Sequence, residues 1–189
     1  GASPILINCT IAGNKAASGG GIYNNINASP QIRNTIVFGN SSGITSAGGS
    51  NPVITYSMVQ EFSGGTGNLD GSPHQHFQNP KDPSLAPNAT GDYQLQACSP
   101  AINRGDNTLL LSGQTQDIQG NSRAVHTIVD LGAYEYQNTL NTGLSSIAQN
   151  DDERTLNVTG PTDFLGNNEG CRLIASIVPA GTPKFAGTL

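Results

Sequence analysis

The 189-residue chain is poor in aromatic rings and in charge. It has no tryptophan, one methionine, 5% aromatic residues and 11% charged residues. Eight lysines and arginines against thirteen acids give a formal net charge of −5 without a basic cluster, which argues against nucleic-acid binding. No apolar run approaches the roughly 20 residues that a membrane-spanning helix needs, and no signal peptide is recognisable. The sequence therefore predicts no nucleic-acid partner and no transmembrane segment.

Cysteine is also scarce, because the three cysteines lie far apart and no CxxC pair occurs. This spacing excludes zinc-ribbon and thioredoxin-like sites. We expect Cys9 to point inward as a small apolar residue, and a disulfide between Cys98 and Cys171 stays open. So few cysteines are compatible with an exported bacterial protein that does not depend on disulfides.

Glycine, in contrast, is abundant with 24 residues, and short β-branched segments repeat along the N-terminal part. Residues 3–14 read SPILINCTIAGN and residues 29–40 read SPQIRNTIVFGN, and the two align without a gap. A weaker third copy, NPVITYSMVQ, begins at residue 51, so that the prolines of the copies are 26 and 22 residues apart. Such a period is typical of stacked repeats, in which one repeat cannot bury its apolar face alone.

Each copy predicts two short strands joined at an asparagine, Asn8 in the first and Asn34 in the second. Strand side chains alternate with a period of two, no helical stripe of useful length occurs, and asparagine tolerates the left-handed conformation of a corner. A glycine-rich return then completes one coil of a parallel β-helix. The alternative is a β-sandwich in which the similarity of the copies is accidental.

Stacked coils place equivalent residues about 4.8 Å apart in neighbouring coils. Leu6, Ile32 and Ile54 would then form one apolar column. Asn8 and Asn34 would be neighbours whose side-chain amides hydrogen-bond in a ladder.

The repeat pattern dissolves after the third copy. Residues 61–92 are rich in glycine and proline and predict a long loop. Strand character resumes over residues 92–103, and residues 108–137 predict another strand pair. We therefore expect β-helix coils and a capping region over residues 1–137. A second β-rich segment, residues 138–189, contains the strand-like runs TLNVTG and CRLIASIVP and looks incomplete.

Five pieces of the chain carry a resemblance to a known family: ITYSMVQ (54–60), GTGN (65–68), GDYQLQACSPAINRGDNT (91–108), DIQGNSR (117–123) and VDLGAYEYQ (129–137). They resemble the end of bacterial proteins with a choice-of-anchor Q domain, and the preceding coils are similar to pectate-lyase-like repeats. One departure is the segment LDGSPHQHFQNP (69–80), where the family usually shows an Asp-Pro-Leu-Phe-like stretch.

The resemblance implies an all-β fold, a right-handed single-stranded parallel β-helix, and no defined catalytic site. It also implies export to an extracellular or outer-surface location, often in Bacteroidota. The tail, residues 138–189, is similar to the β-sandwich-like segment that follows the β-helix in long secreted proteins. Because both ends of the chain look cut, we expect a fragment of a longer polypeptide.

A polysaccharide-lyase site needs a basic residue, several acids and a cation on one exposed sheet face. The coils are expected to expose Ile7, Thr10, Arg33, Ile36, Thr55 and Met58. Only Arg33 is basic, and neither stacked neighbour, at positions 7 and 55, is an acid. The sequence therefore argues against a lyase site within these residues.

Two histidines could supply part of a metal site. His74 and His76 would lie on one side of an extended segment, but a third ligand is not apparent beyond Asp70 or Asp82. The alternative is two ordinary loop histidines, and we expect the isolated His126 to be structural.

Acids stand out near the end of the first region. Asp117 and Arg123 frame a DxxGNxR turn, which a carboxylate would fix by accepting from backbone N–H groups and pairing with the guanidinium. A structural calcium ion held by Asp106, Asp117 and backbone carbonyls is the sharper alternative, and no other cofactor is expected.

Two classes of function remain. The favoured one is a non-catalytic structural or adhesive module at the cell surface, which binds polysaccharide or other surface proteins or associates with copies of itself. The alternative is the C-terminal part of a secreted polysaccharide lyase or hydrolase, with its active site on coils that precede residue 1. The first is favoured because the residues that catalysis needs are missing from these coils.

Overall fold

The computed structural model describes residues 1–62, 64–71, 76–87, 90–97 and 99–137, together with the backbone of residues 146–149 and 156–159. It divides into two compact units, Gly1–Asn138 and Thr139–Leu189. The part that it describes is mostly β, with many short parallel strands in several sheets and only 3-10 turns of three residues as helices. None of the described helices is long and apolar enough to cross a membrane.

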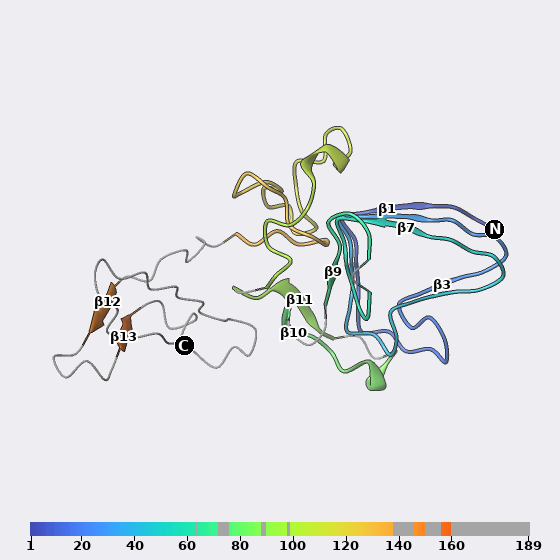
Figure 1. Ribbon diagram of the computed structural model, residues 1–189, viewed down its shortest axis with the longest axis horizontal. Helices are drawn as coiled ribbons and strands as arrows, with labels where there is room; N and C mark the ends of the chain where they lie inside the picture. Colours follow the sequence, from blue (N-terminus) through green and yellow to red (C-terminus); the bar gives the residue numbers. More distant parts are fainter. Residues whose placement is uncertain are drawn as a thin grey trace, which may run out of the picture. The chain divides into compact units, whose positions relative to one another are not determined.

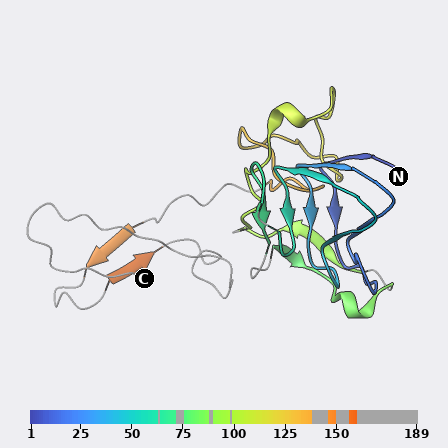
Figure 2. The same ribbon diagram turned by 45° about the vertical axis from the view of Figure 1, so that its right-hand side comes forward.

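Three parallel sheets are built from successive passes of the chain (Figure 1). The first contains β1 (Ile5–Ile7), β4 (Gln31–Arg33) and β7 (Val53–Thr55). The second contains β2 (Thr10–Ile11), β5 (Ile36–Val37), β8 (Met58–Val59) and β9 (Leu69–Asp70), which lie side by side and point the same way (Figure 2). The third contains only β3 (Ile22–Asn24) and β6 (Ile44–Ser46).

The strand register places the same apolar position of each pass side by side. Leu6 pairs with Ile32, and Ile32 pairs with Ile54. Ile32, in the middle, is completely buried, which is worth about 1.5–3 kcal/mol for a side chain of this size. Paired residues of successive passes are 26 and 22 residues apart, which is also the spacing of the prolines in the repeats. The strand register therefore follows from the alignment of the repeat sequences.

The corner between the first two sheets is left-handed in all three passes. Its residues are Asn8, Asn34 and Tyr56, with φ angles of 49°, 46° and 45°. The prediction of an amide ladder between Asn8 and Asn34 is wrong, because their side chains do not hydrogen-bond to each other. The Asn34 amide instead donates to the backbone oxygen of Asp106 at 2.9 Å and accepts from its N–H at 2.8 Å. The buried Asn8 amide has no hydrogen-bond partner among the described residues.

A polar column does form one residue after the corner. The Cys9 N–H donates to Thr35 Oγ1 at 3.3 Å, and the Thr35 N–H donates to Ser57 Oγ at 3.1 Å. Each hydroxyl also donates to a carbonyl two residues earlier in its own strand, Arg33 O for Thr35 and Thr55 O for Ser57. This column satisfies corner N–H groups that lie outside the strand pairing.

The amide ladder is found at the next turn. The backbone N–H and Nδ2 of Asn14 both donate to Asn40 Oδ1 at 3.0 Å, and the Asn40 N–H donates to Gln60 Oε1 at 3.2 Å. Asn40 Nδ2 reaches across to Ile11 O at 2.8 Å. The repeated asparagine at the end of each copy therefore joins neighbouring passes where the chain leaves the strands.

Residues 99–137, here called the cap segment, pack over the outer face of the second sheet. The Gly132 N–H donates to Asn34 O at 2.8 Å, and the Ala133 N–H donates to Thr10 Oγ1 at 2.9 Å. Gly132 lies against Ile36, and both Ile36 and Met58 are fully buried, so the prediction that they are exposed on a free sheet face is wrong. Gly132 lies 96 positions after Ile36, and the local repeat pattern does not reveal so distant a contact.

The stretch expected as one long loop contains ordered elements. They are β9, β10 (Phe77–Asn79) and a 3-10 turn over Pro83–Leu85. β11 (Asp92–Leu95), where strand character was predicted, pairs antiparallel with β10. Over residues 108–137 the prediction of a strand pair is wrong. Instead of a strand pair they form turns, with a 3-10 turn at Asn107–Leu109 and one isolated bridge between Gln116 and Ser122.

In the second unit, β12 (Ser146–Gln149) pairs antiparallel with β13 (Leu156–Thr159). The β13 residues belong to the predicted TLNVTG strand. The other predicted strand of this region, CRLIASIVP, lies outside the described residues, as do Cys98, Cys171 and His74.

Candidate functional site

A cavity of about 260 Å³, here called the hydroxyl pocket, opens beside β6. The third sheet has two strands, whereas the first and second have three and four, so β6 has no neighbour on its outer side among the described strands. The cavity lies where a further strand would continue this sheet. It is lined by β6 with its preceding residues, by Pro52 and Ile54, and by Val59–Phe62.

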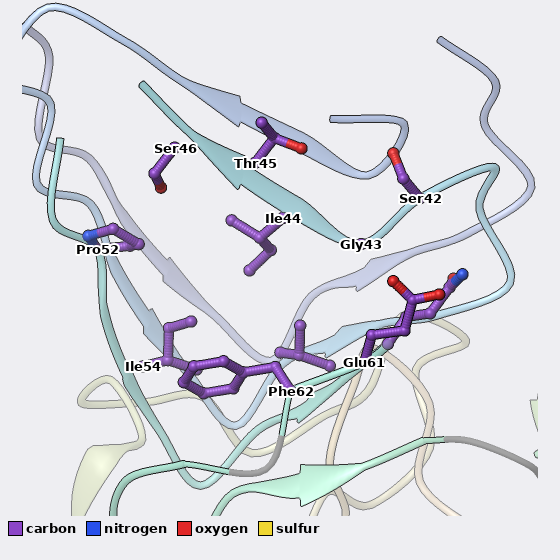
Figure 3. A pocket seen from close by; sticks show the side chains of 11 residues that line it. Ser42, Gly43, Ile44, Thr45, Ser46, Pro52, Ile54, Glu61 and Phe62 are labelled. Carbon is purple, nitrogen blue, oxygen red and sulfur yellow. The ribbon is translucent and has the colours of Figure 1, made fainter. Parts of the chain in front are cut away.

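Phe62 partly closes the hydroxyl pocket. Glu61 has a left-handed φ of 61°, and the Phe62 N–H donates back to Val59 O at 3.2 Å, which folds the chain under the core. Figure 3 shows the Phe62 ring beside Ile54 and facing Ile44 across the space. With 38% of its surface exposed, this ring offers a flat apolar face to a ligand.

The polar groups of the hydroxyl pocket are Ser42, Thr45, Ser46, Gln60 and Glu61. None of the described residues that line it is a lysine or an arginine. The three hydroxyls accept from the preceding pass, Ser42 Oγ from the Gly20 N–H, Thr45 Oγ1 from the Gly19 N–H and Ser46 Oγ from Asn24 Nδ2, so each keeps its O–H to donate. An apolar ring in the same cavity as such polar groups suits a polyhydroxylated ligand, because the site offers both apolar contact and directed hydrogen bonds.

A second cavity of about 300 Å³, here called the amide pocket, lies between the β10–β11 hairpin and the end of the cap segment. Five of its eight lining residues carry side-chain amides: Gln78, Gln94, Gln119, Asn121 and Gln137. Leu95, Glu135 and Tyr136 complete the wall. The sequence analysis did not single out these amides, because they come from three separate segments.

Buried charge holds the amide-bearing loops in place. Asp117 accepts through Oδ1 from the N–H groups of Gln119 and Asn121, both at 2.9 Å. Its Oδ2 accepts from the Glu135 N–H at 3.1 Å. The predicted role of Asp117 as a carboxylate that fixes the DxxGNxR turn is thus seen in its contacts with backbone N–H groups.

Arg123 does not make the expected pair with Asp117. Its Nη1 and Nη2 donate to Gly132 O at 3.0 Å and to Ala133 O at 2.9 Å, which ties the turn to the stretch that covers the second sheet. Nη1 also lies 3.9 Å from Glu135 Oε2. Because burial lowers the pKa of Arg123 only from a very high ordinary value, the guanidinium stays charged.

Two further carboxyls lie inside the cap segment. Burial, followed by the charge of Asp130, raises the pKa of Glu135 to about 8, and burial also raises the pKa of Asp130. Asp130 accepts from the N–H groups of Asn103 and Tyr136, both at 2.7 Å. Glu135 is therefore mostly protonated at neutral pH, which fits its long distance to Arg123.

The calcium hypothesis named Asp106 and Asp117 as ligands. Asp106 Oδ1 accepts from the N–H and hydroxyl of Thr108 at 2.8 and 2.7 Å, so it caps the 3-10 turn that follows. Both carboxylate oxygens of Asp117 accept from backbone N–H groups. The described residues contain no group of three or more His, Cys, Asp or Glu side chains that could hold a metal ion.

The other residues predicted as possible site residues, His76 and Arg33, each make contacts of their own. His76 is fully buried, contacts Gly71 O through Nε2 and packs edge-on against Phe38 with ring centroids 4.6 Å apart. Arg33 lies between Ile7 and Thr55 in the register, and its guanidinium donates to Gln31. Neither stacked neighbour of Arg33 supplies the acid that a lyase site needs.

Comparisons with protein-family models, with curated proteins and with solved structures found no match for this chain.

Proposed function

We propose that this chain is a non-catalytic glycan-binding module built on a right-handed parallel β-helix. The observation that carries the proposal is the hydroxyl pocket, where the partly exposed Phe62 ring faces Ile44 of β6 and hydroxyl groups line the same cavity (Figure 3). An aromatic face with a polar rim matches the two sides of a sugar ring, the C–H face and the hydroxyl edge.

The parallel register supports the β-helix. Successive passes pair in register at β1–β4–β7 and at β2–β5–β8, with left-handed corners at equivalent positions. The corner and turn columns around Thr35 and Asn40 are the side-chain stacks that a regular coil needs. Right-handedness follows from the strong preference of parallel crossover connections for that hand.

The non-catalytic part of the proposal is supported by the sheet faces. Ile36 lies under the cap segment and Met58 beside it is also fully buried, so this part of the second sheet does not present a face to substrate. Arg33 of the first sheet has no acid beside it in the register. The resemblance to choice-of-anchor Q domain proteins also favours a secreted, outer-surface location, and we propose that the second unit is the β-sandwich-like segment of such proteins.

The test is a glycan array probed with the intact protein, followed by incubation with the bound polysaccharides. We expect binding without cleavage, and we expect the substitution Phe62→Ala to weaken binding at the hydroxyl pocket while Tyr23→Ala, at an exposed aromatic outside it, does not. Release of products with ultraviolet absorbance from a new double bond would support the lyase alternative instead. Binding to no glycan on the array would overturn the proposal.

A further inference from the structure

We propose that the amide pocket is a second saccharide site and that it selects neutral sugar units over acidic ones. The inference rests on the proposed glycan binding and deepens it, because it names another site and a class of ligand. Its starting observation is that five side-chain amides from three segments converge on one cavity of about 300 Å³.

The amides are held so that they present free acceptors. Gln78 donates through Nε2 to Leu95 O at 3.1 Å, and Gln137 donates through Nε2 to Ser122 O at 3.0 Å. Each of these bonds fixes the side chain by its NH₂ group, which leaves its carbonyl oxygen available. Because these side chains are already ordered, they lose less conformational entropy when a ligand binds.

A donor comes from the strand beside Gln78, because β11 pairs with β10. Gln94 is exposed on β11, and its side chain makes no hydrogen bond with the residues that the structure describes. A free amide supplies two N–H donors and one acceptor. The pocket thus offers both kinds of partner, as needed by hydroxyl groups, which donate and accept at once.

The base of the site is rigid. Asp117 holds the Gln119 and Asn121 backbone N–H groups, and the same carboxylate holds the N–H of Glu135 in the pocket wall. The wall also contains Leu95 and Tyr136, both buried, which add apolar contact area next to the amides.

The charge distribution selects against acidic sugars. The described residues that line the cavity include no lysine or arginine, and the Arg123 guanidinium behind them already donates to Gly132 O and Ala133 O. A uronate carboxylate would therefore lose its water without gaining a cationic partner in the wall, whereas a neutral hexose or pentose needs no such partner.

The test measures binding of neutral oligosaccharides (gluco-, manno-, galacto- and xylo-oligosaccharides) and of oligogalacturonate by isothermal titration calorimetry. It uses the intact protein, the double variant Gln94→Ala/Gln119→Ala, and the control Asn79→Ala, an exposed amide on β10 outside the pocket. We expect one neutral series to bind, the double variant to lose at least tenfold in affinity, and the control to bind normally. Circular dichroism checks that all three proteins fold alike.

The outcomes separate this inference from the general proposal. If neutral sugars bind the intact protein and Phe62→Ala abolishes binding while the amide variant binds normally, the amide-pocket inference is overturned and glycan binding stands. If only oligogalacturonate binds, the neutral selectivity is overturned. If no oligosaccharide binds the intact protein, both proposals fail.

Discussion

Asn14 and Asn40, which are 26 residues apart, meet at the turn that follows the second strand of each pass. Both the backbone N–H and the Nδ2 of Asn14 donate to the single Oδ1 of Asn40 at 3.0 Å. The Asn40 side chain therefore links two successive passes at the turn, as backbone hydrogen bonds link them in the sheets. It makes the join between passes a specific set of contacts that substitutions can test.

The substitution Asn40→Ala removes this acceptor and leaves the Asn14 N–H without its partner. An unsatisfied polar group costs about 1–3 kcal/mol, and we expect the free energy of unfolding in urea to fall by that amount. Asn79→Ala, an exposed asparagine outside the turn, is the control and should change stability little. Equal stabilities of the two variants would contradict the role of Asn40.

The substitution Ile32→Ala tests the apolar column. Ile32 is fully buried between Leu6 and Ile54, and truncating a buried isoleucine costs about 2–5 kcal/mol. Val53→Ala on β7, where the side chain is 52% exposed, is expected to change stability by only about 0.5 kcal/mol. A thermal melt of both variants compares them, and a larger effect at Val53 would contradict the column.

The substitution Gly132→Ala tests the attachment of the cap segment. A Cβ at Gly132 would lie 2.7 Å from Thr10 Oγ1 and 2.8 Å from Ile36 Cδ1, so either these two side chains or the cap segment must shift. Gly113→Ala is a matched control, since Gly113 has a similarly positive φ, 82° against 93°, but nothing within 4 Å of its Cβ position.

We expect Gly132→Ala to lower the melting temperature more than Gly113→Ala does, and to increase binding of a hydrophobic dye as Ile36 is uncovered. The control carries the same backbone strain without the contact. If the two alanine variants melt alike and bind the dye alike, Gly132 does not seal the sheet.

Stability should fall as pH rises from about 4.5 to about 8. Over this range the unfolded chain releases the Glu135 proton, at its ordinary pKa of 4.5, while the folded protein retains it because burial raises that pKa to about 8. Protonation in the folded state therefore favours folding at low pH, and this contribution is lost at high pH. Asp130, whose pKa burial also raises, adds a slope of the same sign.

The substitution Glu135→Gln removes the ionisable group. We expect the variant to gain stability relative to the natural protein between pH 5 and pH 9, by a margin on the order of 1–3 kcal/mol, in urea unfolding at each pH. Asn79→Ala, at an exposed side chain without an ionisable group, is the control for the effect of a surface substitution. A Glu135→Gln variant that tracks the natural protein across the whole range would show that Glu135 ionises normally.

The repeat copies were enough to predict the parallel strands and their register. Equivalent positions such as Leu6, Ile32 and Ile54 share one place in each copy, and local sequence decides strand geometry there. The copies also predicted the left-handed corner at Asn8 and Asn34, because asparagine is suited to positive φ. Tyr56 occupies the same corner with φ of 45°, so the fold imposes the conformation where the residue type does not favour it.

What the sequence did not reveal depends on contacts between distant segments. Ile36 was expected on an open face, but Gly132 and its neighbours cover it from far along the chain. The partner of Asn34 is the backbone of Asp106, 72 residues away, rather than the neighbouring asparagine. The amide pocket likewise joins Gln78, Gln94 and Gln119 from segments that share no motif.

Methyl NOE spectroscopy of the isoleucine- and leucine-labelled protein tests the stacking of successive passes most directly. The stacked arrangement predicts cross-peaks between Leu6 and Ile32 and between Ile32 and Ile54, because neighbouring strands lie about 4.8 Å apart. Cross-peaks that instead join these residues to unrelated parts of the chain, with none between the three, would contradict it.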